Sequence, residues 1–189
     1  MKFKLNRAFR AASGELDGLV YRNVRGQVIA SRKPDTSNVV YSEDQIAHRE
    51  RFKQAAAYGK AALAEPAVRA LYEAAAKEKD MPVFAATIAD FFNAPTVDNL
   101  DLSAYNGQVN ELIHIMARDD FGVATVFVSI ADQTGNIIDA GNAVETAAGS
   151  GHWVYSATAT IATGITVTVS AIATDRPGGT AVKTANKSI

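Results

Sequence analysis

The side chains with the clearest potential for catalysis in this chain are three histidines, because an imidazole can act as a general base near neutral pH. They are His48, His114 and His152. Nucleophilic catalysis also requires a nucleophile held against such a base and a group that orients it. The chain has no cysteine, and no Gly-x-Ser-x-Gly motif accompanies any of the histidines. The sequence therefore predicts no catalytic residue, no cofactor and no small-molecule substrate, and we expect a protein that is not an enzyme.

Acidic residues in the second half of the chain offer the oxygen ligands that calcium prefers. The segments that carry Asp98, Asp101, Asp132 and Asp175 would lie together if the intervening strands formed a sandwich whose loops meet at one end. However, no dense Asp-x-Asp-x-Asp spacing is present, and Asp is frequent in turns because its side chain bonds to the nearby backbone. We therefore predict no metal site, and calcium binding by these loops stays open.

Basic residues interleaved with aromatic ones give the N-terminal half its strongest functional signal. Residues 1–60 hold 12 Lys and Arg against 6 Asp and Glu, whereas residues 61–189 hold 7 against 14. A basic hairpin and helix can bind nucleic-acid phosphates, and opposed charges can also join one copy of the chain to another. The residues predicted to make either contact are Arg7, Arg10, Tyr21, Arg22, Arg25, Arg32, Lys33, Arg49, Arg51 and Lys53.

The elements that must position these side chains begin with short strands. Residues 2–5 alternate between polar and apolar types, as a short strand does. Residues 19–24 and 27–32 are two β-rich runs separated by Arg25-Gly26. Two residues ending in Gly suit a tight hairpin, so the sequence predicts a β-hairpin over residues 19–32.

Three helices are predicted to follow the hairpin. Ser42 and Gln45 have the form of a capping box, in which each side chain bonds the other residue's backbone N–H, and the first helix should end near Leu63. Pro66 suits the first turn of a second helix, and Asp80 marks the start of a third. The expected buried faces are Ile46, Phe52, Ala55, Ala56, Ala62 and Leu63, then Val68, Leu71, Tyr72 and Ala75, then Phe84, Ile88, Phe91 and Phe92.

After Pro95 the period of the apolar residues changes from that of a helix to that of a strand. Residues 96–106 are polar and acidic, and we predict an interdomain linker there. Beyond it, roughly seven short strands with regular turn signals are typical of a Greek-key sandwich. Trp153 is expected to fill the core between the two sheets. The strongest β-rich runs are 112–116, 126–130, 137–140, 153–160, 165–174 and 180–185.

Two parts of the chain resemble known groups of proteins. Residues 107–185, which contain Thr-Asp-Arg-Pro-Gly-Gly-Thr-Ala, resemble the small immunoglobulin-like modules of bacterial surface and phage proteins. That resemblance implies a β-sandwich whose role is adhesion, spacing or assembly. Residues 14–64, which begin with Gly-x-Leu-x-x-Leu-Val-Tyr-Arg, resemble the start of bacterial proteins with no established activity. This second resemblance implies no site residue.

The sequence therefore predicts an α+β protein of two domains. A basic hairpin and helical domain spans 1–95, the linker spans 96–106, and an all-β immunoglobulin-like sandwich spans 107–189. We expect a structural or assembly protein that forms homo-oligomers, including filaments, through its N-terminal half. A nucleic-acid-binding protein that uses the basic hairpin and helix is the alternative.

The cellular context is constrained by the absence of long apolar runs. No run approaches the ~20 apolar residues that a membrane span requires, and the N-terminal residues do not form a signal peptide. We expect a cytoplasmic protein or a particle assembled in the cytoplasm, with export by a route that needs no signal peptide left open.

Overall fold

The computed structural model describes residues 13–24, 27–35, 37 and 39–189. The predicted strand at residues 2–5 and the predicted contact residues Arg7, Arg10 and Arg25 lie outside the described residues. The chain forms two compact units, residues 1–46 and residues 47–189. Within the described residues, no helix combines the length and the apolar character that crossing a membrane would demand.

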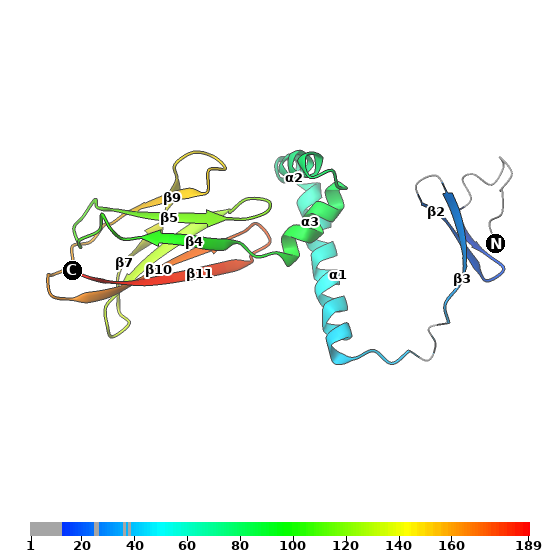
Figure 1. The fold of residues 1–189 in the computed structure, drawn as a ribbon, viewed down its shortest axis with the longest axis horizontal. Coiled ribbons are helices and arrows are strands. Elements are labelled where there is room, and N and C mark those ends of the chain that lie inside the picture. The colour runs from blue at the N-terminus through cyan, green and yellow to red at the C-terminus, as the bar shows by residue number, and fades with distance from the viewer. Residues whose placement is uncertain (1–12, 25–26, 36, 38) are drawn as a thin grey trace. The chain divides into compact units, whose positions relative to one another are not determined.

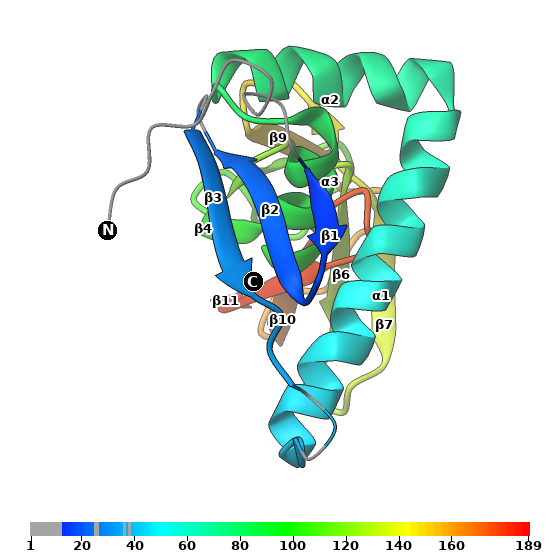
Figure 2. The same cartoon turned by 90° about the vertical axis from the view of Figure 1, so that its right-hand side faces the viewer.

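The first unit contains a three-stranded antiparallel sheet in the order β1-β2-β3 (Figure 2). Its strands are β1 (Gly14–Leu16), β2 (Leu19–Val24) and β3 (Gln27–Arg32). The predicted hairpin is confirmed, because Leu19 pairs with Arg32 and Val24 pairs with Gln27. Asp17 and Gly18 both have positive φ angles of 49° and 72°, as the two central residues of a tight hairpin turn require. The sequence missed β1 because it is only three residues long.

Three helices follow, α1 (Glu43–Ala64), α2 (Pro66–Glu78) and α3 (Val83–Phe92). The capping box is confirmed: the Ser42 N–H donates to Gln45 Oε1 at 3.0 Å, and the Gln45 N–H donates to Ser42 Oγ at 3.3 Å. Pro66 starts α2 as predicted. Asp80 does not start α3, because it lies in the preceding turn with a φ of 49°, and Pro82 precedes the helix without a side-chain cap.

The helices bury smaller side chains than the sequence predicts. Of the expected core residues, Ile46, Phe52, Leu71 and Phe84 are between 39% and 50% exposed. α1 and α3 approach closely at Gly59, where an added Cβ would collide with the side chain of Thr87. A seam of this kind accepts only small side chains. The fully or nearly buried residues are Ala55, Gly59, Ala62, Tyr72, Ala76, Ala86, Thr87 and Asp90.

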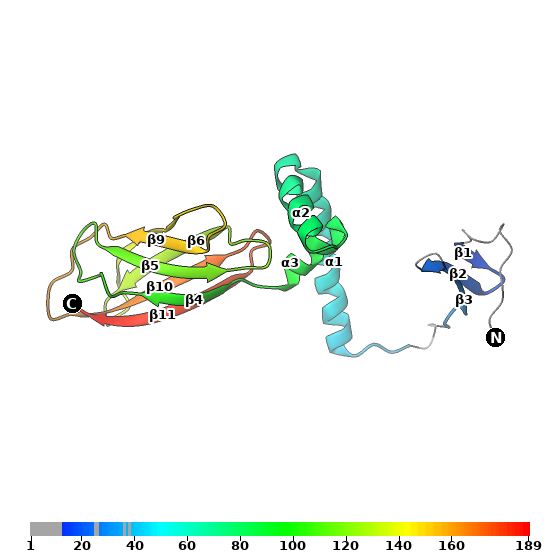
Figure 3. The same cartoon turned by 45° about the horizontal axis from the view of Figure 1, so that its top comes forward.

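Two four-stranded antiparallel sheets form the remainder of the second unit, and they lie face to face in two layers (Figure 3). One has the order β4-β5-β9-β8 and the other has the order β11-β10-β6-β7. This is the strand order of an immunoglobulin-like sandwich. The strands are β4 (Thr96–Asp101), β5 (Leu112–Arg118), β6 (Thr125–Ala131), β7 (Ile137–Asn142), β8 (Val144–Glu145), β9 (His152–Ser156), β10 (Thr166–Thr174) and β11 (Thr180–Ser188).

The core of the sandwich lies between these sheets, and alternate residues of the central strands fill it. Ile113 and Ile115 from β5 meet Val128 and Val169 from β6 and β10, and all four are at most 2% exposed. Trp153 is 7% exposed and belongs to the same core cluster. The prediction that Trp153 lies inside the sandwich is therefore confirmed.

The segment predicted as a linker contains a strand. Residues 96–101 form β4, which pairs with β5 and continues almost directly from α3 (Figure 1). The register of β4 shifts between Val97 and Asn99, so its inward-facing residues Val97 and Leu100 are three positions apart. This bulge hides the alternation of two that marks a strand in a sequence. Independent folding of residues 1–95 and 107–189 stays a prediction.

Candidate functional site

The predicted contact residues of the first unit are placed on both faces of the small sheet. Tyr21 pairs opposite Ala30, and Arg22 pairs opposite Ile29. Because successive residues of a strand point to opposite sides, Tyr21 and Arg22 lie on different faces. Lys33, just beyond β3, pairs with Glu15 at 2.9 Å. The structure therefore does not gather these residues on one uniform basic face.

The face that carries Tyr21 is the more apolar of the two. Strand pairing and alternation place a set of apolar residues on it, and Arg32 lies at its edge. None of the described residues in the three strands is buried, and Leu16 is 68% exposed. We call this surface the apolar sheet face, and it consists of Leu16, Leu19, Tyr21, Val28 and Ala30.

The remaining predicted contact residues lie on the first half of α1. Every residue from Glu43 to Gln54 is exposed, and Arg49, Arg51 and Lys53 belong to this stretch. Lys53 pairs with Glu50 at 2.6 Å. The Arg51 guanidinium carbon lies 5.1 Å from the centre of the Phe92 ring. The basic side chains are thus interspersed with acidic and aromatic partners.

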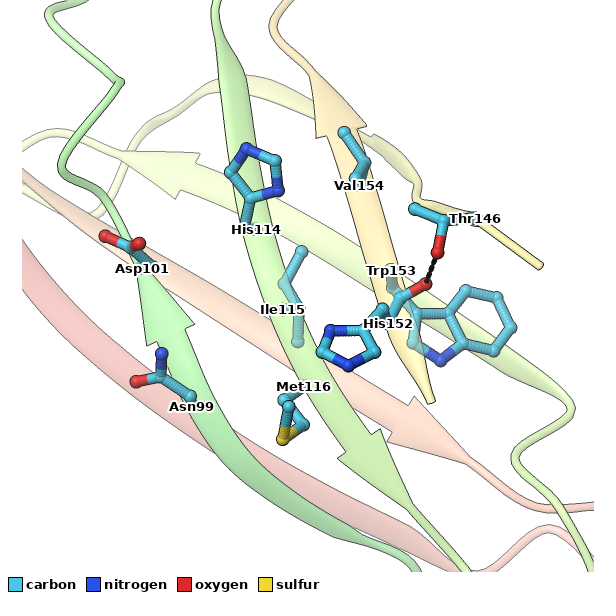
Figure 4. Close-up of a pocket in the computed structure, with 9 residues that line it drawn as sticks. All are labelled: Asn99, Asp101, His114, Ile115, Met116, Thr146, His152, Trp153 and Val154. Atoms are coloured by element: carbon cyan, nitrogen blue, oxygen red, sulfur yellow. Dashed lines mark hydrogen bonds between the residues drawn. The ribbon is translucent and has the colours of Figure 1, made fainter. Parts of the chain in front are cut away.

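A hollow on the outer face of the β4-β5-β9-β8 sheet is a feature that the sequence did not predict (Figure 4). Its lining includes His114 and His152, two of the three histidines for which the sequence predicted no catalytic role. Strand pairing sets His152 opposite Met116, and His114 opposite Asp101. Thr146 Oγ1 donates to the His152 carbonyl at 3.2 Å. Among the described residues, no nucleophile is bonded to either imidazole, so the hollow shows no catalytic arrangement.

A cluster of three carboxylates is the most unusual group of ionisable side chains in the described residues. Asp90 lies on α3, Asp119 follows β5, and Asp175 follows β10. One oxygen from each carboxylate lies within 4.8 Å of the other two. Asp90 is 1% exposed and Asp175 is 3% exposed. We call this group the carboxylate cluster.

Hydrogen bonds offset only part of the cost of burying the carboxylate cluster. The Tyr72 hydroxyl donates to Asp90 Oδ2. The hydroxyl oxygens of Tyr58 and Tyr72 are 2.7 Å apart and share a hydrogen bond. Burial, followed by the charges of Asp119 and Asp175, raises the pKa of Asp90 to about 6, although the Tyr72 bond and the charge of Arg176 act to lower it. Burial also raises the pKa of Asp175. The cluster therefore holds negative charge in a place that disfavours it.

The aspartates predicted to converge at one end of the sandwich do not do so. Ala131, just before Asp132, pairs with Thr168, whereas Thr174, just before Asp175, pairs with Thr125. Asp132 and Asp175 thus lie at opposite ends of an antiparallel pair. Asp98 pairs with Arg118 at 2.5 Å.

Two of the four aspartates instead have the turn role that was the alternative expectation. Asp101 accepts the backbone N–H of Ser103 at 2.9 Å, and Asp132 accepts that of Thr134 at 2.8 Å. The hydrogen bonds around Asp132, led by that from the Thr134 hydroxyl, lower its pKa to about 2. Only Asp175 joins other carboxylates, and its partners come from outside the predicted set.

The sequence contained one signal for the carboxylate cluster. Asp90 is the only charged residue of α3, whose other members are apolar apart from Thr87. A charged residue in such a run is rarely buried unless a partner compensates it. Asp119 gave no comparable signal, because it sits in a polar turn beside Asp120 and Gly122.

Comparisons with known proteins add little beyond the sandwich itself. No protein family model matches the chain, and no curated protein sequence matches it. CopC from Methylosinus trichosporium OB3b is similar over 49% of this chain and 89% of its own, with 19% identity and a TM-score of 0.38. A tetra-tandem repeat from the extending region of a large adhesion protein is similar over 51% of this chain and 24% of its own, with 27% identity and a TM-score of 0.35.

Proposed function

We propose that this protein is a structural protein that self-associates through its N-terminal sheet and the first half of α1, while the sandwich projects or acts as a spacer. The observation that supports the proposal best is the absence of buried residues from the described strands of the first unit. No described residue of β1, β2 or β3 is buried. A small sheet of this kind normally requires a covering element for stability in water.

The apolar sheet face is the part of the first unit that would gain most from a cover. Burying apolar surface stabilises by roughly 25 cal/mol per Å², and Leu16, at 68% exposure, keeps most of its side chain in water. Ile46 and Phe52 of α1 are 50% and 49% exposed. Exposed strand edges also offer unpaired N–H and C=O groups to an incoming strand.

A second copy of the same chain is the partner that the charges favour. Residues 1–60 carry an excess of Lys and Arg over Asp and Glu, and residues 61–189 carry the opposite excess. Contact between the N-terminal half of one copy and the C-terminal half of the next would bring these opposite charges together. Such a head-to-tail contact closes into a ring or continues as a filament.

The first prediction concerns the size of the particle in solution. Full-length protein should sediment as an oligomer at low salt and shift towards the monomer at high salt, because salt screens charge pairs near the surface. A chain that lacks residues 1–40 should sediment as a monomer at both salt concentrations. Sedimentation velocity measured over a range of protein concentrations checks both expectations.

Point variants locate the contact on the sheet. Leu19→Asp places a charge on the apolar sheet face and should reduce the oligomer fraction at least tenfold. Ser31→Asp adds the same charge on the opposite face, since Ser31 pairs with Val20, and should change little. A full-length protein that stays monomeric at high concentration in low salt contradicts the proposal. If that monomer also binds DNA in a salt-dependent manner, the nucleic-acid alternative becomes the better interpretation.

A further inference from the structure

The carboxylate cluster gathers residues from three separate parts of the chain. Asp90 comes from the last turns of α3, Asp119 from the segment after β5, and Asp175 from the turn between β10 and β11. Figure 1 shows α3 beside the end of the sandwich at which β5 ends. The cluster therefore lies where the helices meet the two sheets, so whatever it binds also joins these elements.

Two buried oxygens of the carboxylate cluster have no hydrogen-bond partner. They are Oδ1 of Asp90 and Oδ1 of Asp119. The other oxygen of Asp119 accepts the backbone N–H of Phe121 at 2.7 Å, and Asp175 accepts the N–H of Gly179. Burying a carboxylate oxygen without a hydrogen-bond partner or a counter-charge is strongly unfavourable. Two such oxygens beside a third carboxylate point to a missing positive partner.

The nearby cationic side chains form their closest contacts with groups outside the cluster. Arg176 Nη1 donates to the Phe121 carbonyl at 2.7 Å. Lys79 pairs with Asp120 at 3.5 Å and lies 4.6 Å from the centre of the Phe121 ring. In the part of the chain that the structure describes, no Lys, Arg or His forms an ion pair with any of the three carboxylates. The charge of Arg176 acts on Asp90 from a distance and lowers its pKa, but no cation of the described chain lies in direct contact with the cluster.

We propose that Asp90, Asp119 and Asp175 bind one calcium ion that fastens α3 to the end of the sandwich. The donor atoms are all oxygens, which suit a hard divalent cation, and neither histidine nor cysteine takes part. Calcium ligands lie 2.3–2.6 Å from the ion, so ligands on opposite sides are about 5 Å apart. The three oxygens lie within 4.8 Å of one another, close enough to contact one such ion together. Magnesium usually keeps several waters and binds only one or two carboxylates, which suits a group of three protein carboxylates less well.

Thermal unfolding of the full-length protein tests this proposal. Protein stripped with EDTA should melt at a lower temperature than protein in excess calcium, by about 5 to 10 °C when calcium is 100-fold above its Kd. Isothermal titration calorimetry with calcium chloride should give one site per chain. Magnesium at the same concentration should raise the melting temperature much less. Equal melting temperatures in EDTA and calcium, with no heat of binding, would overturn the proposal, and an equal response to magnesium would overturn the choice of calcium.

Charge-neutralising variants separate ion binding from general damage to the fold. Asp90→Asn and Asp119→Asn should each abolish the calcium response, yet neither should melt below wild type in EDTA, because each removes a carboxylate charge that no ion pair compensates. Asp120→Asn is the matched control, since it removes one carboxylate from the same segment outside the cluster, and it should keep the full calcium response. Loss of the response in Asp120→Asn as well would contradict the assignment of the site.

Terbium luminescence gives a readout that depends on position. Tb³⁺ seeks the same oxygen ligands as calcium and emits when a nearby aromatic ring transfers excitation energy to it. Tyr72 bonds directly to Asp90, so terbium added to the protein should show emission excited through tyrosine, and excess calcium should remove it. Tyr72→Phe should retain calcium binding with a changed excitation spectrum. Emission that survives in Asp90→Asn would place the ion elsewhere and overturn the proposal.

Discussion

At the scale of single residues, two buried aspartates show opposite ways of placing a carboxylate inside this protein. Asp139 on β7 is 5% exposed and accepts four hydrogen bonds from Tyr155, Thr158 and Ala159. Asp90 is 1% exposed, and one of its oxygens has no partner. The donors around Asp139 belong to the fold itself, so it can remain ionised without any ligand.

The hydrogen bonds of Asp139 also join the two sheets. Tyr155 lies on β9 of one sheet, and its hydroxyl donates to Asp139 on β7 of the other at 2.9 Å. Burial raises the pKa of Asp139, but the bonds from Thr158, Tyr155 and Ala159 outweigh it, so the pKa lies below its usual value. Because the folded pKa is depressed, the stabilisation is present above the unfolded pKa, near 3.9, and is lost as pH falls through the folded value.

We therefore predict that Asp139→Asn destabilises the sandwich by about 1–3 kcal/mol at pH 7, because an amide NH₂ group would face backbone N–H donors. The variant should also lose less stability than wild type as the pH falls below 4. Denaturant unfolding at pH 7, 5 and 3 measures both effects. Tyr155→Phe removes a single donor and should cost about 1 kcal/mol while keeping most of the acid response. If Asp139→Asn loses as much stability at low pH as wild type does, Asp139 is not the cause of the acid destabilisation.

The sequence located the acidic residues but not their partners. Asp132 and Asp101 could be predicted as turn residues, because their bonds run to neighbours two positions along. Asp175 was predicted to have Asp132 nearby, whereas its actual neighbour Asp90 lies on a helix far earlier in the chain. Proximity of this kind depends on how α3 packs against the sandwich. The spacing of the aspartates along the sequence does not indicate how α3 packs.

At the scale of elements, α1 is held by a seam of small residues. Ala55, Gly59 and Ala62 are its buried positions, and they repeat at the spacing of one helix face. A Cβ on Gly59 would meet Thr87 Oγ1 and would lie 3.1 Å from a ring carbon of Phe84. The sequence pattern correctly placed Ala55 and Ala62 on the buried face. It also placed Ile46 and Phe52 there because they are apolar, but both are about half exposed. The close approach that excludes large side chains becomes visible only in three dimensions.

Gly59→Ala tests that close approach. Alanine favours a helix over glycine by up to about 1 kcal/mol, whereas overpacking costs about 1–3 kcal/mol. We expect a net loss of about 1–2 kcal/mol, measured by denaturant unfolding, together with faster amide exchange in α1. Adding Thr87→Ala should recover part of the loss, because it removes the hydroxyl that the new methyl group meets. A Gly59→Ala variant more stable than wild type would show that the helices can separate without cost.

Strands were easier to predict than helix faces. The predicted runs 126–130 and 180–185 fall within β6 and β11. Such strands can be predicted because consecutive residues alternate between the core and the solvent. The run at residues 153–160 was too long, since β9 ends at Ser156. β4 was missed because its bulge separates Val97 from Leu100 by three positions. Strands with strict alternation can thus be predicted from the sequence, whereas a strand interrupted by a bulge cannot.

At the scale of the whole molecule, the compact units differ from the predicted domains. The first unit ends at Ile46, and the helices and the sandwich belong to the second. The connection between α3 and β4 is short, and Asn93 in it donates to Asp120 at 3.0 Å. Pro95 is buried. Asn93 and Ala94 are exposed, but only residues 93–95 separate α3 from β4, so little irregular chain lies where the change in apolar period had suggested a boundary.

Limited proteolysis distinguishes these two divisions of the chain. The described residues between β3 and α1 form no regular element, and all but the half-buried Tyr41 are exposed, Val40 at 93%. A broad-specificity protease should therefore cut first between residues 33 and 42, since cleavage requires an extended, accessible backbone. The expected product is a resistant fragment that begins near residue 43 and keeps helices and sandwich together. N-terminal sequencing and intact mass identify it, whereas a first product that begins near residue 100 would support the domain boundary that the sequence predicts.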